Sequence, residues 1–206
     1  MLSSKLQLKI FLTPETAAAA TGASAEALIG VFQGWIRERR LPELLIDVAN
    51  YAHVPEGPGV VLIGHGSDYG LDLGGGRAGL LHNRKRAGLG PSEALGDLAR
   101  RTLHAADLLE REPTLGGRLH FATNELLFRI NDRLAAPSDE ETWAAVKPEL
   151  SDLAARLFTG SFQLTREGTP KELFAVRLTT SAPAILLATL LERAGGPPVA
   201  DASLVT

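Results

Sequence analysis

Residues 59–84 read GVVLIGHGSDYGLDLGGGRAGLLHNR, and this stretch decides the expected fold. Three apolar runs, at 59–65, 69–73 and 78–84, are separated by short turns rich in glycine. Short runs of this kind are typical of β-strands, and tight turns join strands that run antiparallel. The stretch therefore predicts a sheet that is mostly antiparallel.

The segments around this stretch alternate between strands and helices. At 6–12, apolar residues alternate with polar ones, which predicts a half-buried strand. A helix is expected at 25–39, where apolar residues recur at helical spacing, and another at 92–110. The nearly continuous apolar run at 44–48 predicts a strand covered on both faces. Strand, helix and strand in this order favour a parallel crossover.

The second part of the chain repeats a similar order. A hairpin is expected around Thr123 and Asn124, with strands at 118–122 and 125–130. Ser138 and Glu141 form a capping-box pattern that predicts the start of a helix, with a kink or break at Pro148. A second hairpin (162–166 and 172–178) and a last helix (183–193) complete the expected elements.

Both parts contain strand, helix, strand, strand and helix. We therefore predict an α+β fold built from two pseudo-duplicated units of this order, with helices packed on one face of a mostly antiparallel sheet. The units are expected at 1–112 and 117–195, packed together as one compact body, with a loose tail at 196–206. The similarity lies in the order of elements only, since the two parts share no residue motif.

Composition limits the classes of function. The 206 residues are 45% hydrophobic and 22% charged, as in ordinary globular domains, and the formal charge is −3. This charge gives no overall attraction to nucleic acids or anionic lipids, so nucleic-acid binding is not expected. The absence of Cys excludes disulfides and thiol chemistry. With no secretory signal and no apolar run of membrane-spanning length, we expect a soluble cytoplasmic protein.

Potential chemistry gathers in residues 51–86. Arg77, Arg84, Lys85 and Arg86 have no acidic residue between them, so this surface is expected to carry positive charge. Strand alternation places Leu80, His82, Arg84 and Arg86 on one side, and Leu81, Asn83 and Lys85 on the other. The leading hypothesis is that the surface binds an anionic small molecule or an acidic protein partner. Its candidate ligand-binding residues are Arg77, His82, Asn83, Arg84 and Arg86.

Two alternatives remain open. The first is an enzyme that uses a histidine as general acid or base and an arginine to position an anionic substrate. Its candidate catalytic residues are His53, His65, Asp68 and Tyr69. The second is a homo-oligomeric structural or assembly protein whose exposed strands pair between subunits.

Familiar cofactor motifs are weak or absent. Residues 74–79 satisfy G-x-G-x-x-G literally, but a strand is expected after them where a nucleotide site requires a helix. The glycines therefore favour a tight hairpin. No P-loop and no metal-ligand spacing occurs, so neither a cofactor nor a metal is expected.

Overall fold

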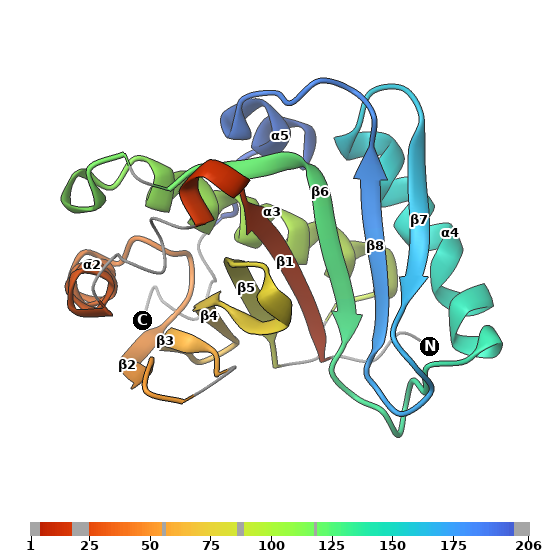
Figure 1. Cartoon of the computed structure of the whole chain (residues 1–206), viewed down its shortest axis with the longest axis horizontal. Coiled ribbons are helices and arrows are strands. Elements are labelled where there is room, and N and C mark those ends of the chain that lie inside the picture. Colours follow the sequence, from red (N-terminus) through yellow and green to blue (C-terminus); the bar gives the residue numbers. More distant parts are fainter. Residues whose placement is uncertain (1–4, 18–24, 55–56, 86–88, 118, 200–206) are drawn as a thin grey trace.

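The computed structural model describes residues 5–17, 25–54, 57–85, 89–117 and 119–199, and these form one eight-stranded sheet with helices (Figure 1). The strand order is β2-β3-β4-β5-β1-β6-β8-β7, and each neighbouring pair is antiparallel. The α+β class and the antiparallel sheet are thus confirmed.

The strands are β1 (Leu6–Leu12), β2 (Leu45–Tyr51), β3 (Gly59–Gly64), β4 (Ser67–Asp72), β5 (Gly79–Arg84), β6 (Phe121–Ile130), β7 (Phe162–Glu167) and β8 (Phe174–Thr180). The helices are α2 (Ala25–Glu38), α3 (Pro91–Glu110), α4 (Glu140–Leu157) and α5 (Leu187–Arg193), with short 3-10 turns η1 (Gly74–Gly76) and η2 (Pro113–Leu115). None of the helices within the described residues combines the length and the apolar character needed to cross a membrane.

The main core lies between the helices and one face of the sheet. The side chains that α2, α3, α4 and α5 bury join alternate strand residues such as Leu8, Leu62 and Phe128 in one apolar cluster. Figure 1 shows α3 and α4 behind the strands. A second, smaller cluster of Phe11, Leu127 and Ala175 contains no helical residue. We call the face that carries this second cluster the open face.

The path of the chain explains the strand order. After β1 at the centre, α2 leads to β2 at one edge, and β3, β4 and β5 return step by step to β1. Four successive antiparallel pairs lead from β1 across the sheet to β2, so these two strands run in the same direction, as the crossover predicts. Three strands lie between them. β6 then pairs with the other side of β1, and α4 leads to the second edge at β7.

Four sequence predictions require correction. β2 is an edge strand with Ile46 more than half exposed, so its apolar run does not mean that both faces are covered. β1 is buried along its whole length instead of on one side, because it occupies the centre of the sheet. The expected hairpin at 118–130 is the single strand β6, in which the Thr123 hydroxyl donates to the Ile185 carbonyl.

The fourth correction concerns α4. Asp139, not Ser138, caps its N-terminus by accepting a hydrogen bond from the Thr142 amide, and the helix continues through Pro148. The glycines lie in a hairpin, because β4 and β5 pair on either side of them, although the connection includes the 3-10 turn η1. Gly75 and Gly76 have φ of 70° and 68°, a left-handed conformation that favours glycine. Of the expected loose tail, residues 200–206 lie outside the described part of the chain.

Candidate ligand pocket on the open face

A cavity of about 420 Å³ lies on the open face over β3, β4 and β5. This volume is within the range of small-molecule sites, which is about 300 to 1,000 Å³. We call it the pocket; its lining residues are Gln7, Tyr51, Pro58, Val61, Ile63, Asp68, Gly70, Asp72, Leu81, Asn83 and Lys85.

The floor of the pocket is apolar because of one row of residues that lie opposite each other across the strands. Val61 pairs with Gly70, and Gly70 pairs with Leu81. A β-carbon at position 70 would lie 3.2 Å from the Pro58 carbonyl oxygen and 3.3 Å from Val61 Cγ2, so a residue larger than glycine would crowd the floor at this point. Ile63 extends this floor along β3.

The adjacent row gives the pocket a polar wall. In this row Asp68 pairs with Asn83, and Asn83 pairs with Gln7. Asn83 Nδ2 donates to Asp68 Oδ2 at 3.5 Å, and Gln7 Nε2 donates to Asn83 Oδ1 at 3.3 Å. Lys85 Nζ donates to Asp68 Oδ1 at 2.6 Å and to the Gly64 carbonyl at 2.8 Å. The side-chain contacts connect β4, β5 and β1, and the Gly64 carbonyl adds a backbone contact to β3.

Buried charge marks the boundary of the pocket toward β1. Lys9 Nζ is 2.7 Å from Asp72 Oδ2 and donates to the Gly74 carbonyl, and its side chain is 1% exposed. Burial lowers the pKa of Lys9, while the hydrogen bond and the charge of Asp72 act in the opposite direction. The pair leaves little net charge at this end of the pocket.

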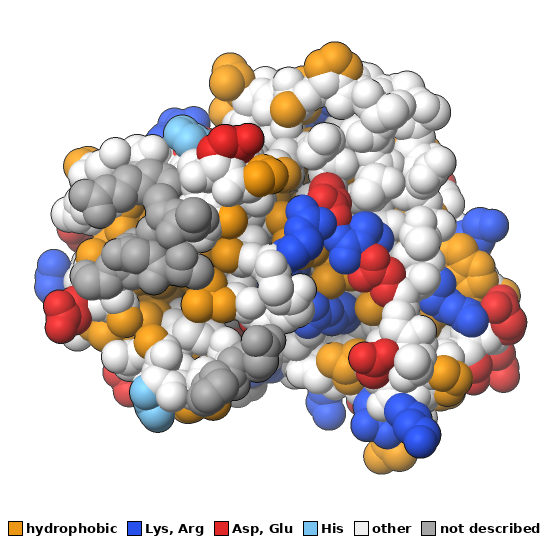
Figure 2. All heavy atoms as spheres, viewed as in Figure 1, with side chains coloured by type: hydrophobic (Ala, Val, Ile, Leu, Met, Phe, Trp, Pro, Cys, Tyr) orange, Lys and Arg blue, Asp and Glu red, His pale blue; other side chains and the backbone are white. Residues whose placement is uncertain are grey.

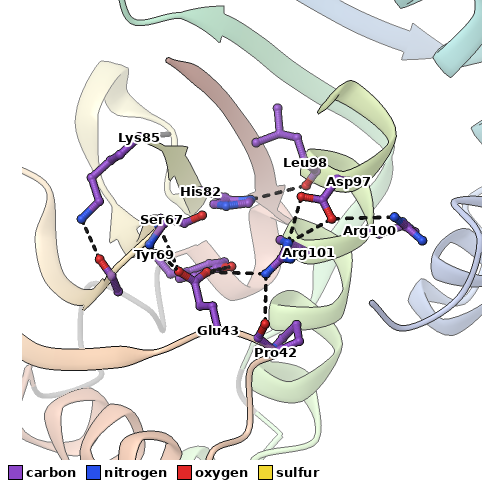
Figure 3. A network of polar contacts seen from close by, with 12 residues as sticks. Pro42, Glu43, Ser67, Tyr69, His82, Lys85, Asp97, Leu98, Arg100 and Arg101 are labelled. Carbon is purple, nitrogen blue, oxygen red and sulfur yellow. Dashed lines mark hydrogen bonds and ion pairs between the residues drawn. The ribbon is translucent and has the colours of Figure 1, made fainter. Parts of the chain in front are cut away.

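Behind the pocket, on the helix-covered face, lies a buried polar network (Figure 3). Glu43 accepts hydrogen bonds from the Gly66 and Ser67 amides and from the Tyr69 hydroxyl, the last at 2.7 Å. Arg101 lies 4.0 Å from Glu43 and forms a closer ion pair with Asp97. The network thus holds the turn between β3 and β4 against α3.

Burial sets the protonation of this network. It raises the pKa of Glu43, although the Tyr69 hydroxyl and Arg101 oppose the shift, and it raises the pKa of Tyr69 well above its usual range. Burial also lowers the pKa of His82 to about 3, so the ring is neutral near neutral pH. The His82 ring stacks on Tyr69, with centroids 4.4 Å apart.

The tautomer of His82 follows from its partner. The Thr102 hydroxyl donates its one hydrogen to the Leu98 carbonyl at 2.6 Å, so it can only accept at the 2.9 Å contact with His82 Nδ1. His82 therefore carries its hydrogen on Nδ1. Nε2 is buried and has no hydrogen-bond partner among the described residues.

The candidate residues from the sequence fall in different places. Asp68 and Asn83 meet in the pocket wall, whereas Tyr69 and His82 are buried on the opposite face of the sheet. His53 and His65 are exposed, and His65 follows the end of β3. The structure thus pairs Asp68 with Asn83 on the open face and Tyr69 with His82 on the opposite face.

The arginines also separate. Arg77 Nη2 donates to Glu125 Oε2 at 2.8 Å and the guanidinium lies 4.1 Å from the Phe11 ring, away from the pocket lining. Arg84 donates to the Ala94 carbonyl at 3.3 Å. Arg86 lies outside the described residues. Because carboxylates pair with both Arg77 and Lys85, the positive charge of this region is locally offset.

Sequence reasoning missed the residues that give the pocket its shape: Gln7, Val61, Ile63, Gly70 and Asp72. The alternation at 80–85 did indicate that Leu81, Asn83 and Lys85 share a side, which is the pocket side. Within the described residues, no three His, Asp or Glu side chains lie close enough together to hold a metal ion. No protein-family model, curated protein or solved structure matches the chain.

Proposed function

We propose that the protein binds a small, uncharged and mainly apolar molecule in the pocket. The observation that carries this proposal is a cavity of about 420 Å³ in which the apolar floor of Val61, Gly70 and Leu81 meets a polar wall. Such a combination of apolar surface with a few convergent polar groups is typical of ligand sites.

Charge favours an uncharged ligand over the anion that the sequence suggested. The carboxylates of Asp68 and Asp72 pair with Lys85 and Lys9, so the pocket offers neither sign in excess. The same pairing gives an acidic protein partner little positive surface to recognise.

The proposal also fits a fold made from two similar units, which we propose for residues 1–112 and 117–195. β1 and β6 pair at the centre, and each leads through a helix to an edge strand, after which the chain returns beside its own first strand. The first unit has two more strands on this return path, β3 and β4. These two strands supply Val61, Ile63, Asp68 and Gly70, so the pocket belongs to the part that differs between the units.

The test is amide NMR with phenol, indole, benzamide and benzoate as probes. We expect an uncharged probe to shift the amide signals of Val61, Gly70 and Leu81. Leu81→Trp should fill the pocket and abolish the shifts. Thr165→Trp is the matched control, because Thr165 lies on the open face in the same row but at the far edge strand.

Two results would refute the proposal: no shift with any uncharged probe at millimolar concentration, or shifts that persist in Leu81→Trp. A stronger response to benzoate than to the uncharged probes would favour the anion hypothesis instead.

A further inference from the structure

One aromatic ring stands at the rim of the pocket and remains accessible to solvent. Tyr51 is the last residue of the edge strand β2, lines the pocket and is 44% exposed. It pairs with Gly59 of β3, two residues before Val61, so its side chain lies on the open face together with the apolar floor. The accessible surface of Tyr51 thus borders the space that a ligand would occupy.

The strand next to Tyr51 leaves room beside the ring. Gly59 has a φ of 67°, and a β-carbon there would lie 2.6 Å from the Leu71 carbonyl oxygen, so the position requires glycine. Pro58 and Val61, on either side of Gly59 along the chain, both line the pocket. Position 59 therefore contributes no side chain to fill the space between Tyr51 and the rest of the pocket.

The spacing of the strands suits a second ring in this space. Neighbouring strands lie about 4.8 Å apart, and aromatic rings prefer centroid separations of about 4.5 to 7 Å. A flat ring above the backbone of Gly59 would be one strand away from Tyr51, within this range. Among the residues that the structure describes, no other aromatic ring and no cation lies against Tyr51, so its ring is available for such a contact.

We propose that the pocket, if it binds a small molecule as proposed above, selects one that carries a flat aromatic ring and holds this ring against Tyr51. The floor of Val61 and Leu81 favours any apolar group, saturated or aromatic, because the hydrophobic effect is not directional. Contact with Tyr51 adds to this only when the ligand has a π-system that can stack on the tyrosine ring or meet it edge to face. Tyr51 therefore determines the specificity of the pocket, and the floor supplies affinity.

The experiment compares pairs of probes that carry the same polar group on an aromatic or a saturated ring: phenol with cyclohexanol, and benzamide with cyclohexanecarboxamide. Titration of the amide signals of Val61, Gly70 and Leu81 gives the affinities. For the wild-type protein we expect the aromatic member of each pair to bind roughly fivefold more tightly. Tyr51→Phe keeps the ring and should keep this ratio. Tyr51→Ile keeps an apolar side chain suited to a strand and should reduce the ratio by about the same factor.

A control variant and a second readout make the test specific to the ring. Ile46 belongs to the same edge strand and is 56% exposed but does not line the pocket, so Ile46→Ala should leave the ratio unchanged. In the wild type, the ring protons of bound phenol should show nuclear Overhauser effects to the ring protons of Tyr51. The other tyrosine of the chain, Tyr69, is fully buried on the helix-covered face and cannot produce them.

The results distinguish the two proposals. Equal binding of aromatic and saturated probes by the wild type, or an aromatic preference that Tyr51→Ile retains, would overturn selection by Tyr51 and leave small-molecule binding in place. Binding of none of the four probes would overturn both. If Tyr51→Ile fails to fold, the nuclear Overhauser effects in the wild type decide the matter, since their absence with phenol bound contradicts a ring held against Tyr51.

Discussion

Lys9 lies between two leucines that occupy equivalent places on the open face: Leu81 beside it in β5 and Leu127 beside it in β6. Leu81 is partly exposed at the pocket, whereas Leu127 is buried next to Phe11 and Ala175. The difference comes from the next residue in the row. On the side away from Lys9, Leu81 pairs with Gly70, which has no side chain to cover it. In the same position Leu127 pairs with Arg177.

Arg177 belongs to a charged layer over β6 and β8. Its guanidinium and that of Arg77 lie over the Phe11 ring, and both pair with Glu125. Figure 2 shows basic and acidic side chains gathered side by side on this face. Long cationic side chains can cover apolar surface while their charged ends stay in water. Around β6 and β8 the open face is thus closed by ion pairs, and around β4 it is left hollow.

The helix-covered face shows the reverse distribution. The polar side chains of Glu43, Tyr69 and His82 lie behind the pocket. Behind the charged layer lie the apolar side chains of Phe128, Val176 and Leu178. Polar groups buried behind the pocket hold its strands in one arrangement, because each unmet hydrogen bond there would be costly. This contrast leads to four predictions.

The largest effect on stability is expected for the buried ion pair of Lys9 and Asp72, which lies at the boundary of the pocket. Asp72→Asn would leave Lys9 buried without its ion pair, which typically costs about 3 to 5 kcal/mol. Urea unfolding would measure the loss. The double variant Lys9→Met with Asp72→Asn should recover most of it, because no buried charge remains. A loss below about 1 kcal/mol in the single variant would show that water reaches Lys9 and that the boundary is open.

The second prediction concerns the loss of stability at low pH. Because the pKa of His82 is lowered to about 3 in the folded protein, the unfolded chain binds a proton there more readily. Stability from this group is complete above the unfolded pKa of about 6.5 and falls as the pH decreases toward 3. Between pH 7 and pH 4 the loss should be about 3 kcal/mol.

His82→Phe keeps a flat ring on Tyr69 but cannot be protonated. Urea unfolding of this variant at both pH values should show a pH dependence smaller by about the same amount, whatever its absolute stability. An unchanged pH dependence would mean that other groups cause the acid sensitivity and that the buried network behind the pocket is not its source.

The third prediction tests the contrast directly with the two leucines. Leu127→Ala removes buried apolar surface beneath the charged layer and should cost about 2 kcal/mol, the lower end for a core leucine. Leu81→Ala enlarges a cavity that is already open to solvent and should cost less than about 1 kcal/mol. Chemical denaturation of the two variants side by side is the measurement. Equal costs would show that the open face is uniform and that the pocket is filled in solution.

The sequence predicted much of the sheet because glycine and apolar runs are local signals. The strands around residues 59–84 and the hairpin of β7 and β8 follow from such signals. The failures at β2 and β6 have a common cause: an apolar run does not reveal whether a strand lies at the edge, and a polar pair such as Thr123 and Asn124 resembles a turn unless its distant partner is known. Ile185, which Thr123 contacts, is 62 residues away.

The site was less accessible to prediction for the same reason. Alternation correctly grouped Leu81, Asn83 and Lys85, but the register that brings Gln7 beside Asn83 joins residues 76 positions apart. The sequence of this segment alone suggests that Arg77 makes the surface positive, but in the fold Arg77 forms an ion pair with Glu125 of β6, which offsets its charge. The charged residues of one segment predict the charge of the surface only when the residues that pair with them across the sheet are known.

The smallest effect is expected in the charged layer. Burial alone would raise the pKa of Glu125, but hydrogen bonds from Arg77 and Arg177 outweigh it and lower the pKa. Glu125→Gln removes this charge while it keeps the shape, and because Arg77 is 43% exposed, water can solvate its guanidinium instead. We expect a loss of about 1 kcal/mol or less at low ionic strength. In about 1 M salt, where the screening length is only about 3 Å, wild type and variant should unfold at nearly the same urea concentration. A loss of 3 kcal/mol or more that persists in salt would instead place a desolvated ion pair over Phe11, and the charged layer would then be as much a buried structure as the network behind the pocket.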